Sequence, residues 1–399
     1  MGFASGPISF RRFLMAGRHP ESFDGALLSA LAEHAFGRHA TATGDGLELG
    51  WIRPTHLFDT DFSSESGVTV GRFTYVALRV DRTGAPPAIV RSYRMMEEAA
   101  RLADSGREFL TRSQKKEAKE AALARAEQEA KEGVFRRVSA TPLLIDWADG
   151  AAYFGSTSAS AADRLTALCA DTFDISLIPA HSEEVAFRIA QRLGLMSAFE
   201  ESAPEYVAPP PQGAAGFDAG ALDAHDRTYL GREFLTYLWN LRDDAEGLCP
   251  IGGGKEVEFV LHKSLSLECE RGVTGRLSIR ADAPTTSVEA RAALASGKQP
   301  TKLSLLAVIG GEEASFTLDG RQFTVSGLAL PRSDEKDAAA ALEERFMTLR
   351  LVADTLDAMY AEFLRLRLGS AWSRTWSGVR AWAMREVASD VRGPQRASA

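Results

Sequence analysis

The spacing of apolar residues divides the chain into segments of strand-like and of helical character. Alternation typical of strands runs from Pro7 to Met15 and from Val68 to Val80, and apolar residues at helical spacing run from Phe23 to Phe36. From Leu143 to Leu193, short predicted strands and helices follow one another. Because both kinds of element occur throughout the chain, we expect an α+β fold with mixed sheets.

Residues 91–133 have a different character. Met95, Met96, Ala99 and Leu102 give one amphipathic helix, and a second helical stretch follows Ser105-Gly106, from Thr111 to Glu132. The second stretch consists mainly of Lys, Glu and Ala, with Leu123 as its only large apolar residue. A helix that is polar all round is usually exposed or bridges to a partner. We therefore expect these two helices to form a projecting arm.

Turn signals and composition suggest the domain boundaries. Asp149-Gly150 and Asp319-Gly320 are each flanked by strand-like segments and predict β-hairpins. Residues 201–227 are rich in Pro and Gly, lack Lys and Arg before Arg227, and predict a linker. The resulting parts are an N-terminal α+β domain (1–90), the arm (91–133), a βαβ-like part of the N-terminal body (134–200), the linker (201–227), a C-terminal α+β domain (228–368) and a tail (369–399).

Two C-terminal segments each allow more than one interpretation. A predicted helix from Asp334 to Leu366 places its apolar residues alternately four and three apart, which fits either a core-facing helix or a dimer contact. In the tail, tryptophans alternate with arginines. This pattern fits packing on the protein body, contact with DNA, or attachment to a membrane surface. The tail residues concerned are Trp372, Trp376, Trp382, Arg374, Arg380 and Arg385.

Charge and cysteine content narrow the function classes. The formal net charge of the 399-residue chain is −8, which argues against DNA binding unless positive charge is concentrated locally. Cys169, Cys249 and Cys269 are far apart and form no metal-binding spacing, which is typical of a reducing cytoplasm. No apolar run is long enough to span a membrane, and no signal peptide is evident, so we expect a cytoplasmic protein.

No segment predicts a catalytic, cofactor or metal site. Gly252-Gly253-Gly254-Lys255 lacks the spacing and the hydroxyl residue of a phosphate-binding loop and fits a turn into a strand. Glu256 and Glu258 alternate with apolar residues, as on the solvent face of a strand. With Asp146 they keep a metal-dependent nuclease open as an alternative, and a protein-binding scaffold is another.

Clusters of basic residues are more informative. One cluster lies at the predicted start of the second arm helix, which is the helix end where the macrodipole disfavours cations. Two interpretations are open. Either an external polyanion neutralises these cations, or the helix is simply solvated, with ion pairs such as Lys116–Glu120. Gly297 can end a short helix and expose the lysines after it on a loop. Exposed cations suit contact with a DNA backbone. The candidate DNA-binding residues are Arg112, Lys115, Lys116, Lys119, Arg136, Arg137, Lys298 and Lys302.

Several short motifs occur in an order that resembles the RdgC family of bacterial recombination-associated DNA-binding proteins. They are Gly50-Trp51-Ile52-Arg53-Pro54, Val134-Phe135-Arg136-Arg137-Val138 and Leu144-Ile145-Asp146, followed by the segment 291–305 with its Gly-Lys pair and Thr-Lys-Leu. Where the family has a basic finger after Ile-Arg-Ala, this chain has Asp282-Ala283-Pro284.

The resemblance implies an α+β protein that forms a head-to-head homodimer closed into a ring. Double-stranded DNA would pass through the ring without sequence preference, and the protein would restrain RecA-promoted strand exchange without catalytic activity, cofactor or metal. Phe135 would lie at a subunit contact, and the protein would be associated with the nucleoid.

Overall fold

The computed structural model describes residues 3–38, 47–208, 226–269 and 275–385. These residues form two compact units, each assembled from separate stretches of the chain. The first unit comprises residues 16–150 and 163–176, and the second lies within 2–15, 151–162 and 177–399. Most of the predicted linker, residues 209–225, and the end of the tail, residues 386–399, lie outside the described residues.

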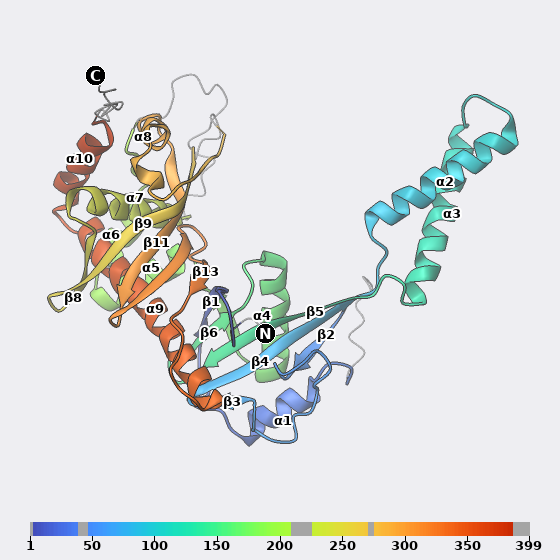
Figure 1. Ribbon diagram of the computed structural model, residues 1–399, viewed down its shortest axis with the longest axis horizontal. Helices are drawn as coiled ribbons and strands as arrows, with labels where there is room; N and C mark the ends of the chain where they lie inside the picture. The colour runs from blue at the N-terminus through green and yellow to red at the C-terminus, as the bar shows by residue number, and fades with distance from the viewer. Residues whose placement is uncertain (1–2, 39–46, 209–225, 270–274, 386–399) are drawn as a thin grey trace, which may run out of the picture. The chain divides into compact units, whose positions relative to one another are not determined.

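The first unit is built on a small antiparallel sheet in the order β2-β4-β5, with β3 paired to β4. Helices α1 and α4 accompany the sheet, and α2 and α3 are inserted between β4 and β5 (Figure 1). The bounds are α1 Gly25–Glu33, β2 Leu47–Ile52, β3 Thr69–Val70, β4 Phe73–Arg82, α2 Pro87–Ser105, α3 Arg112–Lys131, β5 Arg137–Asp146 and α4 Ala159–Phe173.

Buried aromatic residues hold α4 to this sheet. The indole nitrogen of Trp51 donates a hydrogen bond of 2.8 Å to Thr172 Oγ1, and that of Trp147 donates one of 2.8 Å to Thr74 Oγ1. The ring of Phe173 lies 5.8 Å from Trp51 and 5.5 Å from Trp147, centroid to centroid. Both indoles are therefore buried with their polar atoms satisfied, as buried tryptophans require.

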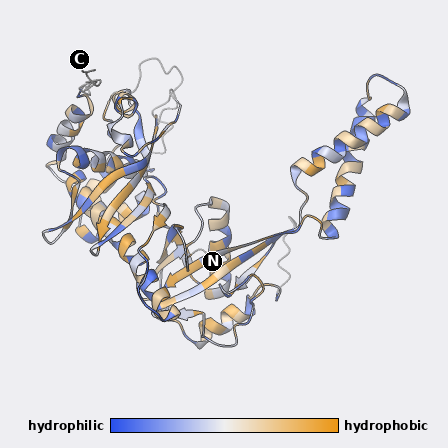
Figure 2. Cartoon of the chain, in the orientation of Figure 1, coloured by the Kyte–Doolittle hydropathy of each residue, from blue (hydrophilic) through white to orange (hydrophobic). Residues whose placement is uncertain are grey.

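Helices α2 and α3 pack against each other as an antiparallel hairpin, hereafter the hairpin. Three buried alanines of α3 at four-residue spacing, Ala118, Ala122 and Ala126, form the seam and let α2 approach closely. Across the seam, Arg101 pairs with Glu117 at 2.8 Å, and Tyr93 donates a hydrogen bond to Glu129. Hydrophilic and hydrophobic residues are interspersed along both helices (Figure 2). Because few apolar side chains are buried between α2 and α3, the stability of the hairpin depends on helix caps and ion pairs as much as on packing.

The second unit contains a larger sheet in the order β10-β9-β11-β12-β13-β1-β6, with β8 beside β9 and β7 beside β1. The N-terminal strand β1 pairs antiparallel with both β13 and β6. The bounds are β1 Ile8–Ala16, β6 Ala151–Phe154, β7 Ser176–Pro179, β8 Leu248–Gly252, β9 Lys255–Glu268, β10 Leu277–Arg280, β11 Gln299–Ile309, β12 Glu312–Asp319 and β13 Val325–Ala329.

Helices of the second unit pack on this sheet and on one another. Helix α7 lies against β9 and β11, α9 contacts α5, α7 and β11, and α10 contacts α7 and α8 (Figure 1). The core includes the stacked rings of Tyr360 and Phe363 from α9, with the ring of Phe234 from α7 tilted against both. The bounds are α5 Ser182–Leu193, α6 Met196–Glu201, α7 Tyr229–Asp244, α8 Val288–Ala295, α9 Ala338–Arg367 and α10 Trp372–Ala383.

The expected α+β class is confirmed, since the described residues form ten α-helices and thirteen strands. The expectation of mixed sheets is wrong, because the strands of the described residues pair antiparallel. The apolar seam of the long predicted helix faces the core: Phe346, Leu349, Leu356, Tyr360 and Phe363 of α9 are buried. The alternation of apolar residues predicts two separate strands, from Val257 to His262 and from Leu265 to Glu268, but the structure has one strand there, β9. Lys263 has a positive φ of 60°, and the pairing with β11 shifts register there, so a bulge continues the strand where the pattern suggested a break.

Candidate nucleic-acid interface

The first two turns of α3 present positive charge in one direction. Arg112, Lys115, Lys116 and Lys119 fall within an arc of roughly 100° around the helix axis, and all four are exposed. Lys116 lies 3.8 Å from Glu120, a weak exposed pair. Within the described part of the chain, the other three residues form no ion pair. These four residues are called the cationic face below.

The local structure makes this charge unfavourable in the free protein. Helix α3 begins with a capping box, in which Gln114 N donates to Thr111 Oγ1 at 3.3 Å and Thr111 N donates to Gln114 Oε1 at 2.9 Å. The first turn contains no acidic residue. The macrodipole disfavours cations in the first turn of a helix by about 0.3–1 kcal/mol each at exposed sites, which applies here to Arg112 and Lys115. The cationic face therefore has excess positive potential that a bound anion would relieve.

Arg136 and Arg137 follow the hairpin but differ in their surroundings. Arg136 Nη2 lies 2.6 Å from Asp81 Oδ2 and 3.9 Å from Glu48. Burial alone would raise the pKa of the Asp81 carboxyl, but hydrogen bonds from Arg79 and Arg136 lower it. Arg136 thus helps to neutralise a buried carboxylate, whereas Arg137 is exposed at the start of β5.

Arg137 also has a cationic neighbour that the sequence pattern did not identify. In the β4–β5 register, Arg137 is the direct partner of Arg82, and both residues are exposed. Like charges directly opposite each other destabilise a strand pair. The strand predicted from the sequence ended at Val80, whereas β4 continues to Arg82. Identifying the Arg82–Arg137 pair required both this continuation and the pairing register of β5.

Lys298 and Lys302 belong to the second unit and are held by local contacts. Gly297 has a φ of 90° and follows α8, as expected for a residue that ends a helix. Lys298 donates a hydrogen bond to the carbonyl oxygen of Gly275, and Lys302 Nζ lies 3.2 Å from Asp319 Oδ2. The prediction that both lysines lie on a loop is wrong for Lys302. Strand β11 begins at Gln299, because residues 299–307 pair with β9.

Phe135, the predicted subunit-contact residue, lies in the short connection between α3 and β5. It is half-buried, between the exposed residues Val134 and Arg136. Its position next to Arg136 and Arg137 places it at the base of the hairpin.

The carboxylates considered for a nuclease site do not form one in the described ranges. Glu256 and Glu258 are exposed on β9, while Val257 and Phe259 between and after them are buried. Asp146 is buried and lies 2.5 Å from Arg72 Nη2. No group of three or more His, Cys, Asp or Glu residues in the described parts of the chain is arranged to hold a metal ion. The three cysteines are buried and unpaired by disulfides.

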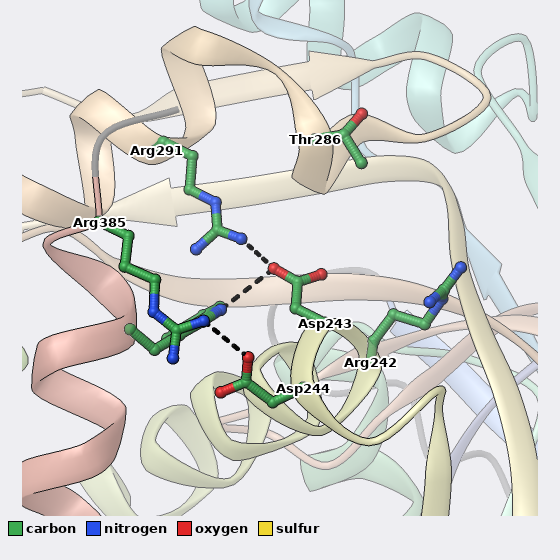
Figure 3. A pocket seen from close by; sticks show the side chains of 7 residues that line it. Arg242, Asp243, Asp244, Thr286, Arg291 and Arg385 are labelled. Carbon is green, nitrogen blue, oxygen red and sulfur yellow. Dashed lines mark hydrogen bonds and ion pairs between the residues drawn. The ribbon is translucent and has the colours of Figure 1, made fainter. Parts of the chain in front are cut away.

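A cavity of about 450 Å³ in the second unit is lined by arginines and aspartates from α7, α8 and the end of α10 (Figure 3). Arg291 pairs with Asp243, and its guanidinium lies over the Trp382 ring, 4.5 Å from the centroid. Trp382 Nε1 donates a 3.2 Å hydrogen bond to the same carboxylate, and Arg385 lies 3.0 Å from Asp244.

This cavity shows how the tryptophan-rich tail is held. Trp372, Trp376 and Trp382 are all buried, so packing on the protein body is the correct interpretation of the three considered. Burial raises the pKa of the Asp243 carboxyl, and Arg291 opposes that shift. The Arg291–Asp243 and Arg385–Asp244 pairs and the Trp382 hydrogen bond therefore join α10 and the residues just after it to α7 and α8.

Comparison with protein-family models gave no match, and neither did a search of curated proteins. Among the described residues, no helix combines the length and apolar character needed to cross a membrane.

Proposed function

We propose that this protein binds double-stranded DNA without sequence preference, through the cationic face of α3 together with Arg82 and Arg137. The observation that carries the proposal is that four exposed cations lie on one side of α3, three of them without an ion pair among the described residues. Phosphate contacts need only charge and reach, which exposed Lys and Arg side chains provide.

The dimensions of the cationic face fit a duplex backbone. From Arg112 to Lys119 the helix advances about 10 Å along its axis, close to the rise of about three base pairs of B-DNA. Four neutralised phosphates would contribute roughly −3.6 to the slope of log K against log salt concentration. Arg82 and Arg137 would add to this value.

The resemblance to the RdgC family extends the proposal to assembly and cellular role. On that basis we propose a homodimer that encircles the duplex, with Phe135 at a subunit contact, and that restrains RecA-type strand exchange without a catalytic step. The other predicted DNA contacts, Arg136, Lys298 and Lys302, belong to this extended proposal.

Fluorescence anisotropy with a random duplex, measured across a salt series, tests the core proposal. The variant Lys115→Ala/Lys119→Ala should weaken binding to all sequences equally and reduce the salt slope by roughly 2. The matched control is Arg332→Ala/Lys336→Ala, which removes the same charge from exposed positions in the second unit. Equal losses in both variants, or no duplex binding at low salt, would overturn the proposal. Light scattering of the free and bound protein tests the homodimer separately.

A further inference from the structure

The connection between α2 and α3, residues 106–111, presents an aromatic ring to solvent. Phe109 is 79% exposed, the largest exposure of any bulky apolar side chain in the described parts of the chain. Burying a phenylalanine gains about 1.5–3 kcal/mol relative to leaving it exposed. Among the described residues, the ring therefore has no partner that would recover this energy.

The connection is fixed at both ends, so it holds Phe109 at a defined place. Helix α2 ends at Ser105 and is followed by Gly106 in the left-handed conformation, and Ser105 Oγ donates to the Leu102 carbonyl at 3.0 Å. On the other side, the capping box of Thr111 and Gln114 starts α3 two residues after Phe109. Six residues between the two helices leave the ring little freedom to fold back.

Basic residues outnumber acidic residues next to this ring in the sequence. Arg107 and Arg112 flank it in sequence and are exposed, and Lys115 and Lys116 follow within one turn of α3. Glu108 is the only acidic residue between Arg107 and Lys116. A partner that covers the ring must therefore also bind these basic side chains. This requirement favours a polyanion that has accessible apolar surfaces between its charged groups.

We propose that Phe109 inserts partway between adjacent base pairs of the duplex bound by the cationic face, and so unwinds and kinks the DNA. This inference rests on the proposed function and deepens it, because it specifies how that duplex is engaged. Apolar side chains that enter a base step unstack it, while nearby cations neutralise the adjacent phosphates. The insertion needs no particular base, so it is compatible with binding that ignores sequence.

The test measures the linking number of a plasmid relaxed by a type I topoisomerase in the presence of saturating protein. The wild-type protein should lower the linking number after deproteinisation, since insertion unwinds the helix. Phe109→Ala should abolish this change and weaken binding about tenfold, at the lower end of the range for an aromatic ring stacked on a base. Its salt slope should equal that of the wild type, because the phenyl ring carries no charge. Phe109→Trp should retain the unwinding.

Phe58→Ala is the matched control, because Phe58 is 72% exposed and lies outside the hairpin. It should unwind the plasmid as the wild type does. Salt-sensitive binding with no change in linking number, or equal unwinding by Phe109→Ala, would overturn the proposed insertion of Phe109 and leave the proposed function intact. No duplex binding at low salt would overturn both. Phe109-dependent binding to vesicles of anionic lipid, without duplex binding, would assign the ring to a membrane surface instead.

Discussion

Arg367 Nε donates a hydrogen bond of 2.6 Å to Glu233 Oε2 inside the second unit, and both side chains are buried. The other carboxylate oxygen of Glu233 accepts a 2.8 Å hydrogen bond from the backbone N–H of Glu205, and Arg367 Nη2 donates to the Ala203 carbonyl at 2.7 Å. The pair on α7 and α9 therefore holds the segment that precedes residue 209. Burial raises the pKa of Glu233 to about 7, although Arg367 opposes the shift.

This raised pKa predicts a dependence of stability on pH. Between the ordinary glutamate pKa of 4.5 and about 7, the folded protein binds more protons at Glu233 than the unfolded chain does. The contribution to the free energy of unfolding is therefore fully present below the lower value and is lost as pH rises through the higher one, by up to about 3 kcal/mol. Glu233→Gln should flatten this part of the profile. Urea denaturation of both proteins at pH 5, 6, 7 and 8 measures it, and parallel profiles would contradict the prediction.

Gly231 on α7 lies so close to Gly320 that no side chain fits. A Cβ added to Gly231 would lie 1.6 Å from the Gly320 carbonyl oxygen, a backbone atom that cannot move aside. We expect Gly231→Ala to destabilise the protein by about 3 kcal/mol or more, because overpacking here displaces two backbones.

Gly378 in α10 is the matched control for Gly231→Ala. A Cβ there meets no atom within 4 Å. Gly378→Ala should stabilise α10 by about 0.5–1 kcal/mol through helix propensity alone. Thermal unfolding of the two variants should therefore shift in opposite directions, and a common shift would refute this description of the α7 contact.

Arg137→Glu should change stability and DNA binding in opposite directions. The substitution turns the repulsive Arg82–Arg137 pair into an attractive cross-strand pair, which should stabilise the free protein by about 0.2–1 kcal/mol. The same change should weaken duplex binding and reduce its salt dependence. Thermal unfolding and anisotropy on one preparation test both effects. A variant that is more stable and binds DNA as the wild type does would remove Arg82 and Arg137 from the interface.

Trp382→Ala should separate the role of the tail from DNA binding. The Trp382 ring is buried, packs edge-on against Trp239 at 5.6 Å between centroids, and hydrogen-bonds Asp243. Removing the ring should lower the free energy of unfolding by about 3–5 kcal/mol or detach α10 from the rest of the second unit. Limited proteolysis should then cut within residues 372–383. Duplex affinity should be unchanged, and a large loss of affinity in still-folded protein would show that the tail contributes to the DNA surface.

Local pattern was enough to predict the hairpin and the long core helix. The capping residues Thr111 and Gln114 and the alanine-rich composition specify α3 without reference to any other element. Similarly, the seam through Phe346 and Phe363 of α9 identified the buried face, although it could not by itself exclude a dimer contact. These features depend on residues within a few turns of one another.

Features that need a distant partner were not predictable. Strand β2 was missed, because Gly50 interrupts its alternation and because its place in the sheet is set by pairing with β4. The hydrogen bond from Arg136 to Asp81 depends on the β4–β5 register, and no local sequence pattern predicts that register. The cationic face of α3 was visible in the sequence, whereas the Arg82–Arg137 pair became visible only once the strands were aligned.

The position of β1 constrains the order in which the protein can be assembled during translation. Residues 11–14 of β1 can pair with β6 once residues 151–154 have been made, and β7 can join β1 soon afterwards, but Ile8 must wait for Leu328, its partner on β13. At about 5–20 residues per second, the ribosome needs roughly 15–60 s to cover that distance. Throughout this interval a nascent strand with apolar residues has an open edge that any neighbouring strand could occupy. The rate of synthesis and protection by chaperones should therefore govern the yield of correctly folded protein.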